Sequence, residues 1–210
     1  MINFNLLIDF DSTFIKEESL ELISKISLSN SKDKFNKIQL ITDITNKAMN
    51  GDISFQQALI QRVKLLNANK EHINTAIEKI KNNISTSFIE NKIFFKKNAK
   101  NCFIVSGGFK EIISPIVEPF GFKKENIFAN EFIYNKKNIV SIDKNNPLSN
   151  DLGKVEVANG IQGKNIIIGD GYTDYEIKKY GKAISFIQFI ENINRKKLNS
   201  KANFIANDFN

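Results

Sequence analysis

Three short apolar runs, each ending in a polar residue before a turn, constrain the fold of this chain more than any other feature. They cover residues 4–9, 101–106 and 164–170 and end in Asp9, Ser106 and Asp170. Near-continuous apolar runs of this length are typical of strands in parallel sheets that helices cover on both faces. Because helical patterns separate the runs, we predict an open, mostly parallel α/β sheet with helices on both faces. The carboxyl ends of such strands meet at one edge, where we expect a functional site.

The segment between the first two runs predicts an inserted helical unit. It contains about ninety residues without a strand signal. Helical spacing recurs near residues 17–28, 33–50, 54–67 and 70–82. In the third segment, apolar residues at i, i+4 and i+7 beginning at Leu59 indicate one apolar helix face. We therefore predict a helical cap over residues 15–83, above a core formed by residues 1–14 and 84–210. Within that core, a hairpin is expected around Asn135-Lys136-Lys137.

Composition excludes several classes of protein and site. The 210 residues suffice for one core and an inserted subdomain, and 41% hydrophobic with 25% charged residues is ordinary for a soluble globular chain. No apolar run approaches the ~20 residues that span a bilayer, and no signal peptide is recognisable, so we expect no membrane partner. Cys102 is the only cysteine and His72 the only histidine, which excludes an intrachain disulfide and a Cys/His metal site. A lone cysteine fits a reducing compartment, and we expect a cytoplasmic location.

The net charge of +7 has two interpretations. A basic chain is a candidate for nucleic-acid binding. The lysines, however, are spread along the whole chain, and short basic runs such as Arg195-Lys196-Lys197 are typical of a solvated surface. Because no recognisable binding motif accompanies the charge, we expect no nucleic-acid partner.

Two aspartates at the end of the first run indicate a cation site. Asp9 and Asp11 are two residues apart, so on a strand their carboxylates point the same way. Crowded negative charge is unfavourable unless a cation lies between the groups or one of them holds a proton. A hard divalent ion such as Mg²⁺ prefers oxygen ligands, and Asp170 with Asp174 would add carboxylates from another strand end. The alternative is that Asp9 and Asp11 only cap the following turn.

The second run leads into Ser106-Gly107-Gly108, which is a candidate phosphate site. A hydroxyl and glycine backbone N–H groups at a helix N-terminus can cradle phosphate oxygens. The alternative, equally common for an isolated Ser-Gly-Gly, is an ordinary strand-to-helix turn.

Three motifs in a fixed order resemble a known superfamily. They are Asp9-Phe10-Asp11-Ser12-Thr13, Val105-Ser106-Gly107-Gly108-Phe109 and Gly169-Asp170-Gly171-Tyr172-Thr173-Asp174. Together they resemble the haloacid dehalogenase superfamily of phosphatases and, within it, the phosphoserine phosphatase family, from about residue 4 to the C-terminus. The stretches 44–51 and 55–63 are similar to that family's substrate-binding cap. The resemblance implies a Rossmann-like core sheet with an inserted α-helical cap.

The resemblance implies catalytic roles at the strand ends. Asp9 would be the nucleophile that forms an aspartyl-phosphate, and Asp11 would protonate the leaving oxygen and then activate water. Mg²⁺ would be held by Asp9, Asp170 and the backbone carbonyl of Asp11, and would neutralise phosphate charge. Ser106 and Gly107 would bind phosphate oxygens.

The resemblance also implies an amino-acid reader on the cap side. Glu18 falls where the family binds the substrate ammonium, and Arg62 falls where a guanidinium grips the substrate carboxylate as a bidentate fork. Met49 and Phe55 would shape the wall over the substrate. The alternatives are a Glu18 that only favours a helix dipole, a solvated Arg62, and a Met49 and Phe55 that belong to the core of the cap.

Two positions depart from the family pattern. Thr173 stands where the family often has Asn, and its hydroxyl can still donate one hydrogen bond to phosphate or to Asp9. The family's phosphate-binding lysine often precedes a glycine, but here Leu152 precedes Gly153 and Lys154 comes two residues after Leu152. Helix residues i and i+2 do not share a face. Either the loop shifts so that Lys154 reaches the phosphate and Asp9, or the role is unfilled, and we favour Lys154 as the catalytic lysine.

The resemblance implies hydrolysis of O-phosphoserine to serine and phosphate, as in serine biosynthesis, by a monomer or a homodimer. Two alternatives stay open. One is a phosphatase or phosphotransferase that acts on another small phosphomonoester. The other is a non-catalytic phosphometabolite binder, which the displaced lysine would fit.

Overall fold

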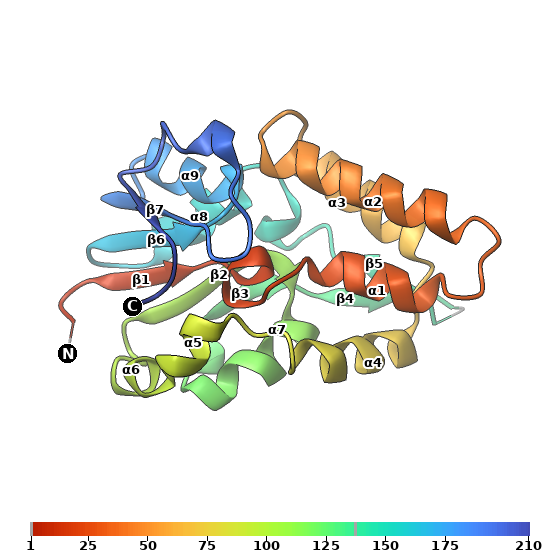
Figure 1. Ribbon diagram of the computed structural model, residues 1–210, viewed down its shortest axis with the longest axis horizontal. Helices are drawn as coiled ribbons and strands as arrows, with labels where there is room; N and C mark the ends of the chain where they lie inside the picture. The colour runs from red at the N-terminus through yellow and green to blue at the C-terminus, as the bar shows by residue number, and fades with distance from the viewer. Residues whose placement is uncertain (1, 137) are drawn as a thin grey trace.

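A six-stranded parallel sheet forms the centre of the computed structural model, which describes residues 2–136 and 138–210 (Figure 1). Its strand order is β3-β2-β1-β6-β7-β8, and β4 pairs separately with β5 in an antiparallel hairpin. The strands are β1 (Asn5–Ile8), β2 (Cys102–Phe109), β3 (Ile127–Asn130), β4 (Phe132–Tyr134), β5 (Val140–Ile142), β6 (Asn165–Gly169), β7 (Ser185–Phe189) and β8 (Phe204–Ala206). The predicted open parallel sheet is therefore confirmed.

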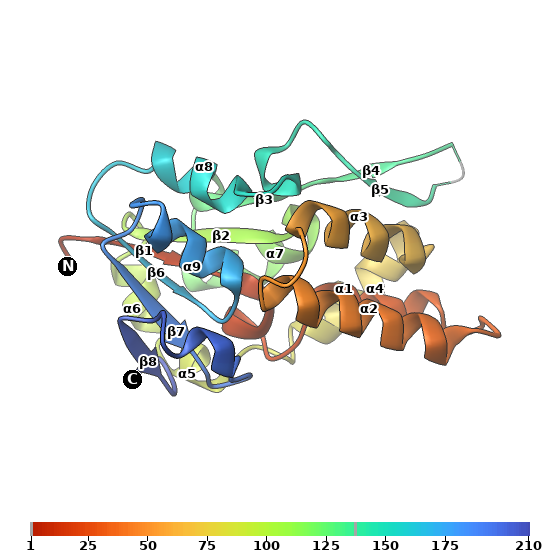
Figure 2. The same ribbon diagram turned by 90° about the horizontal axis from the view of Figure 1, so that it is seen from above.

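Helices cover both faces of this sheet (Figures 1 and 2). They are α1 (Ser19–Ser27), α2 (Lys34–Met49), α3 (Phe55–Leu66), α4 (Lys70–Ile80), α5 (Thr86–Glu90), α6 (Lys92–Lys97), α7 (Lys110–Val117), α8 (Gly153–Gly160) and α9 (Tyr172–Lys179). Helices α5 to α7 lie on one face, and α8 and α9 lie on the other. Within the described ranges, no helix has the length and apolar character that crossing a membrane requires.

The three predicted apolar runs become the adjacent strands β2, β1 and β6. Leu7 of β1 is in parallel register with Phe103 of β2 on one side and with Ile167 of β6 on the other. Because all three strands run the same way, their carboxyl ends lie at one edge of the sheet. The polar residues that follow β1 and β6, Asp9 and Asp170, are thereby brought together.

Alternate side chains of β1 pack into different layers. Leu6 and Ile8 belong to the apolar cluster that contains Phe88 of α5, whereas Leu7 belongs to the cluster that contains Ile177 of α9. Successive side chains of a strand point to opposite faces, so a strand covered on both sides is largely apolar. This double burial explains the apolar run Leu6–Ile8, which follows Asn5, the single polar residue of β1, at the beginning of the strand.

Helices α1 to α4 follow β1 and pack against one another at one end of the sheet (Figure 1). The four helical segments predicted between the first two runs are thus confirmed. The only histidine has a structural task here, because His72 and Asn69 form a reciprocal capping box at the start of α4. The division into a cap over residues 15–83 and a separate core stays a prediction.

Two contacts tie α3 and its following loop to the rest of the chain. Asp151 accepts hydrogen bonds from the Ser54 hydroxyl and from the Gln56 backbone N–H at the start of α3. At the other end, the Val140 N–H of β5 donates to the carbonyl oxygen of Ala68 at 2.9 Å. The hairpin predicted in this region is confirmed as β4 and β5, although position 137 of its expected turn lies outside the described residues.

Candidate active site

The turn after β1 aims two aspartates at one place. Asp9 directly follows the strand, and Phe10–Phe14 form a tight helical turn. Within it, Ser12 has a φ of 56°, in the left-handed region that residues other than glycine rarely adopt. Packing holds the turn, since the Phe14 ring lies 4.7 Å from that of Phe88 between centroids. Backbone strain of this kind persists only where the surroundings impose it, and it gathers at functional sites.

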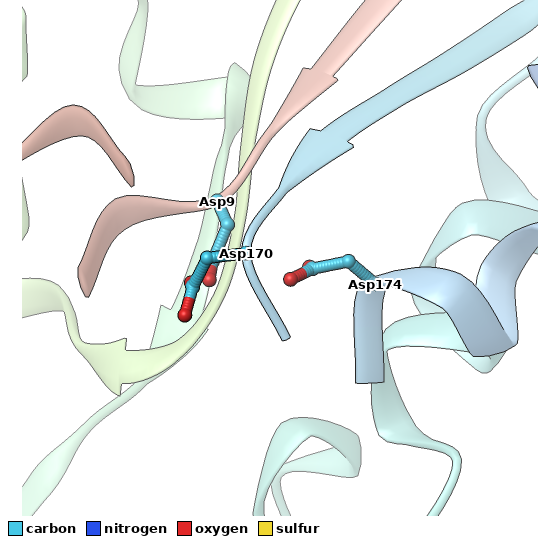
Figure 3. Close-up of side chains that lie close together, drawn as sticks. All are labelled: Asp9, Asp170 and Asp174. Carbon is cyan, nitrogen blue, oxygen red and sulfur yellow. The ribbon is translucent and has the colours of Figure 1, made fainter. Parts of the chain in front are cut away.

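Ten of the eleven predicted site residues line a single cavity at this edge of the sheet. They are Asp9, Asp11, Glu18, Met49, Phe55, Arg62, Ser106, Gly107, Lys154 and Thr173, joined by Leu20 and Gly108. The eleventh residue, Asp170, lies beside Asp9 (Figure 3). Residues more than 160 positions apart in the chain are therefore assembled around one space, although their roles stay predictions.

Three buried carboxylates converge beside this cavity. Asp9 and Asp170 extend from the ends of β1 and β6, and Asp174 points toward them from α9 (Figure 3). One oxygen from each lies within 4.8 Å of the others. Burial raises the pKa of Asp170 to about 7, against the opposing effect of Arg195, and burial together with Asp9 raises the pKa of Asp174 to about 8. Oxygen ligands crowded in this way fit a hard divalent cation.

Lys154 lies directly against these carboxylates. Its Nζ is 2.8 Å from Oδ1 of Asp9 and donates to Oδ1 of Asp174 at 2.8 Å. Burial alone would lower the lysine pKa, but the two carboxylates outweigh it and raise the pKa above its usual value. The Lys154 side chain therefore reaches Asp9, whereas its contact with phosphate stays a prediction. Leu152 adopts a left-handed φ of 61°, and a side chain at Gly153 would collide with the Pro147 carbonyl.

Asp11 is a partly buried acid that is held in place at the start of α1. Its Oδ1 accepts a hydrogen bond from the backbone N–H of Ser19 at 2.8 Å. Burial, with the charges of Glu18 and Asp9, raises the pKa of Asp11 well above its usual value. The hydrogen bond from Ser19 opposes this shift without cancelling it. A raised carboxyl pKa favours the protonated form, which is the form that acts as a general acid.

The C-terminal part of β2, where its pairing with β3 is irregular, forms the second wall. The Ser106 hydroxyl accepts from the Gly108 N–H at 3.0 Å. A Cβ on Gly107 would lie 2.4 Å from the Phe55 ring, so only glycine allows α3 to approach this closely. Opposite, the buried Thr173 hydroxyl has no hydrogen-bond partner among the described residues. An orphaned buried hydroxyl beside glycine N–H groups fits a phosphate oxygen, because burying an unpaired polar group is otherwise unfavourable.

Glu18 and Arg62 bring opposite charges to the cap side of the cavity. Arg62 is only 3% exposed, and its Nη1 donates to the Thr45 hydroxyl at 3.1 Å. Glu18 Oε1 accepts from the Ser12 hydroxyl at 2.8 Å, and its side chain makes no capping hydrogen bond to α1. Burial lowers the pKa of Arg62 against the effect of Glu18, and burial raises the pKa of Glu18 against the effects of Arg195 and Arg62. The solvated Arg62 is thereby excluded.

Met49 and Phe55 contact the core rather than only the interior of the cap. A Cβ on Gly171 would lie 2.9 Å from the Met49 sulfur. Met49 also packs with Ile44 and Ala58. It therefore serves both as wall of the cavity and as packing within α2 and α3, so the two alternatives are not exclusive.

Sequence reasoning missed Arg195 and was wrong about its surroundings. The run Arg195-Lys196-Lys197 was interpreted as solvated surface, yet the Arg195 side chain is only 4% exposed, whereas that of Lys197 is 61% exposed. Arg195 Nε donates to Oδ2 of Asp170 at 2.7 Å. Its two exposed neighbours masked it, and nothing in the local sequence distinguishes the three.

Two asparagines were also missed, the half-buried Asn192 and the buried Asn130. Asn192 Nδ2 lies within hydrogen-bonding distance of the carbonyl oxygens of Ser12 and Thr13, both at 3.2 Å, and so fastens the turn after Asp9. Asn130, at the end of β3, donates to the carbonyl oxygens of Gly107 at 2.9 Å and Leu148 at 3.0 Å. A polar residue ending an apolar run, the signal used for Asp9 and Ser106, could have found Asn130.

Comparisons with curated proteins point to one family. No protein-family model matches the chain. The phosphoserine phosphatase of Methanocaldococcus jannaschii is 30% identical over 190 residues, which cover 86% of this chain and 84% of that protein. The chloroplastic phosphoserine phosphatase of Arabidopsis thaliana is 28% identical over 185 residues, which cover 85% of this chain. The match spans only 60% of the length of that plant relative.

Solved structures agree with these relatives. A phosphoserine phosphohydrolase-like protein from Francisella tularensis has a TM-score of 0.89 at 36% identity, over 98% of this chain and 95% of that one. A phosphoserine phosphatase solved as a phospho-aspartyl intermediate analogue has a TM-score of 0.77 at 25% identity, over 99% of this chain and 94% of that one. Identity of 30% or more over most of both chains, together with the shared fold, places the chain in the phosphoserine phosphatase family of the haloacid dehalogenase superfamily.

Proposed function

We propose that the protein hydrolyses O-phosphoserine to serine and phosphate. The observation that carries this proposal is the pair of opposite charges Glu18 and Arg62, which lines the same cavity as Asp9, Ser106 and Lys154. An amino acid presents one ammonium and one carboxylate, so one anion and one cation on the cap side match it. The relatives named above carry the name of this activity.

Asp9 is the proposed nucleophile, and Asp11 the proposed acid and base. An Asp9 oxygen attacks phosphorus and forms an aspartyl-phosphate, while protonated Asp11 gives its proton to the leaving serine oxygen. The raised pKa of Asp11 supports this role, because the group holds its proton until the leaving oxygen needs it. In the second half-reaction, Asp11 takes a proton from the water that attacks the aspartyl-phosphate, which regenerates Asp9 and releases phosphate.

The phosphate oxygens are held from three directions. The Ser106 hydroxyl and the Gly107 N–H bind one side, the Thr173 hydroxyl donates from another, and the Lys154 ammonium neutralises charge as it develops. The position of Lys154 against Asp9 supports this assignment, because the same ammonium can pair with the nucleophile and with the phosphate bonded to it. Met49 and Phe55 close the apolar wall above.

A divalent cation, which we propose to be Mg²⁺, fits the carboxylates beside Asp9. Asp9, Asp170 and the backbone carbonyl of Asp11 would hold it, and Asp174 lies in the same group of close oxygens. When bound, the ion neutralises phosphate charge and favours attack by an anionic nucleophile. The raised pKa values of Asp170 and Asp174 support a cation site, since these carboxylates lack enough positive charge of their own.

The helical segment 15–83 is the proposed cap that selects the substrate. It supplies the amino-acid-binding pair and the apolar wall, whereas residues 1–14 and 84–210 supply the chemistry. All the proposed site residues belong to one chain, so a monomer and a homodimer would both have complete sites. We further propose a role in serine biosynthesis in the cytoplasm, which agrees with a single buried thiol at Cys102.

Phosphoserine hydrolysis by the purified protein tests the proposal directly. Phosphate release is measured with Mg²⁺ and after removal of the ion by a chelator, and activity is expected only with the ion. A panel of esters separates phosphoserine from other small phosphomonoesters. The proposal is wrong if phosphoserine is not turned over with Mg²⁺, or if an ester without amino and carboxylate groups is hydrolysed with equal kcat/KM.

A further inference from the structure

A buried arginine lies against the carboxylates of the site without a role in the reaction described above. Arg195 follows β7, and its side chain is only 4% exposed. Its backbone is anchored, because Gln188 Nε2 donates to its carbonyl oxygen at 3.1 Å. A guanidinium out of water is tolerated only when it is well paired. The identity of its partners therefore indicates what Arg195 does.

The three guanidinium nitrogens contact three different parts of the molecule. Nε donates to Oδ2 of Asp170 at 2.7 Å, and Nη1 donates to Oδ1 of Asn46 at 3.1 Å. Nη2 lies 3.5 Å from Oε1 of Glu18. These partners belong to the end of β6, to helix α2 and to the residue before α1. A planar guanidinium holds several partners in a fixed arrangement, which a single ammonium cannot do.

At Asp170, the bond from Arg195 fixes the orientation of the carboxylate. Oδ2 is occupied by the guanidinium, whereas Oδ1 has, among the described residues, only a 3.4 Å hydrogen bond from the Thr13 hydroxyl. One oxygen is therefore fastened, and the other is left for a cation. Groups that orient a metal-binding carboxylate typically change metal affinity or activity by about 10- to 100-fold when they are removed.

At Glu18, the same arginine helps to fix the carboxylate proposed to read the substrate ammonium. Oε1 accepts from the Ser12 hydroxyl at 2.8 Å and faces Arg195 Nη2. The carboxylate is thus held between the turn that follows the nucleophile and the guanidinium. Its second oxygen remains for the substrate.

We propose that Arg195 is a positioning residue that links the Asp170 carboxylate, the Glu18 carboxylate and cap helix α2 into one unit. The link to Glu18 rests on the proposed function, whereas the link to Asp170 concerns only the affinity for the cation. Through this unit, the orientation of the Asp170 carboxylate depends on the positions of α2 and of Glu18.

The variant Arg195→Lys tests the unit, because it keeps the charge and removes the three-way fork. Its Mg²⁺ affinity is measured by calorimetry, without substrate. We expect that affinity to fall by about 10-fold or more. The matched control is Lys196→Ala, which removes the adjacent cation on the exposed surface and should leave the affinity unchanged.

A pair of esters tests the link to Glu18. Phosphoserine is compared with 3-phosphooxypropanoate, which is the same molecule without its ammonium group. We expect Arg195→Lys to lower kcat/KM on phosphoserine by about fivefold more than on the other ester, because a displaced Glu18 affects only the ammonium. In the double variant with Glu18→Gln, this extra loss should disappear.

The exposed Asn46 gives a second variant in case Arg195→Lys does not fold. Asn46→Ala removes the partner in α2 and leaves every buried charge in place. We expect a KM for phosphoserine raised about two- to fivefold with kcat nearly unchanged, as for the loss of one hydrogen bond.

Several results would overturn the proposal. They are a Mg²⁺ affinity of Arg195→Lys equal to that of the Lys196→Ala control, equal losses on the two esters, or an unchanged KM in Asn46→Ala. Failure of the proposed function is distinguishable, since it would appear as no phosphoserine turnover by the unaltered protein. The calorimetric comparison would still decide the link between Arg195 and Asp170.

Discussion

The two sides of the cavity are built in different ways. On the core side, Asp9 and Asp170 follow the ends of adjacent parallel strands, and Lys154 forms ion pairs with Asp9 and with Asp174. On the cap side, Glu18 immediately precedes α1, and Arg62 lies on the buried face of α3. Core groups therefore contact one another, whereas Glu18 and Arg62 are held mainly by neighbours such as Ser12 and Thr45.

This difference separates two tasks. A change on the core side alters the charges around phosphorus, so it should reduce the hydrolysis of every phosphate ester. A change on the cap side alters only the recognition of groups that some esters lack. The proposed function therefore predicts two patterns of loss, general for the core and selective for the cap.

The largest effect is expected at the nucleophile. Asp9→Asn keeps the shape of the side chain and removes the attacking anion, so kcat should fall by about 10⁴-fold or more on all esters. Phosphate release is the measurement, and thermal unfolding checks that the variant is folded. A residual rate within about tenfold of the original would contradict nucleophilic catalysis by Asp9.

The next largest effect is expected at Lys154, which is compared with Leu152, the position where the family pattern places its lysine. Lys154→Met should lower kcat by about 10²- to 10³-fold on all esters, because charge developing on phosphate loses its buried cation. Leu152 occupies the family position and is 39% exposed, so Leu152→Ala should retain near-normal activity. If Leu152→Ala lost more activity than Lys154→Met, Lys154 would not be the residue that stabilises the charge on phosphate.

Arg62→Ala tests the selective pattern. We expect kcat/KM on phosphoserine to fall about 10- to 100-fold, the size of a lost hydrogen bond between charged groups. Phosphoethanolamine lacks the carboxylate, so its hydrolysis should change by less than about threefold. Equal losses on both esters would contradict the proposal that Arg62 binds the carboxylate of the substrate.

The stability of the cation-free protein should depend on pH through the core side. The pKa of Asp170 is about 7 and that of Asp174 about 8, both raised above 3.8 by burial. The folded state then keeps protons that the unfolded chain releases above about pH 4, so stability falls as pH rises toward 8 and levels off beyond it. A loss of about 1 kcal/mol would lower Tm by about 2–4 °C. Mg²⁺ should restore more stability at pH 8 than at pH 5, and a Tm that rises with pH in the absence of Mg²⁺ would contradict this.

Most of the fold could be predicted because the central strands and the helices between β1 and β2 each have a local sequence pattern, an apolar run or helical spacing. The central residues of the runs that became β1, β2 and β6 are apolar, since both faces of each strand are covered. Strands β3 and β7 were not predicted. Ser185 and Gln188 interrupt the apolar pattern of β7, and its pairing with β6 and β8 makes it a strand.

Site residues that belong to contiguous motifs could be predicted from the sequence. Those whose partners are distant in the sequence and become adjacent only in the folded chain could not. Asp9 and Ser106 end apolar runs, which is a local signal. Arg195 lies 25 residues from Asp170 and 149 from Asn46, and its exposed neighbours hide it. The reach of Lys154 depends on the left-handed backbone at Leu152, a conformation that the residue type does not indicate.

The smallest effect is expected where the two sides meet, at Asp151. This core residue accepts from the Ser54 hydroxyl and the Gln56 N–H, on either side of Phe55. Asp151→Ala removes an exposed contact of about 1 kcal/mol or less, comparable to the loss of a helix cap. KM for phosphoserine should therefore rise about two- to fivefold with kcat nearly unchanged, because the wall over the substrate is held less firmly. Ser54→Ala should have a similar effect, and the double variant should lose little more than either single one. A fall in kcat with an unchanged KM would instead show that Asp151 affects the chemical step, through the loop that carries Lys154. Asp151 would then belong functionally to the core side of the cavity.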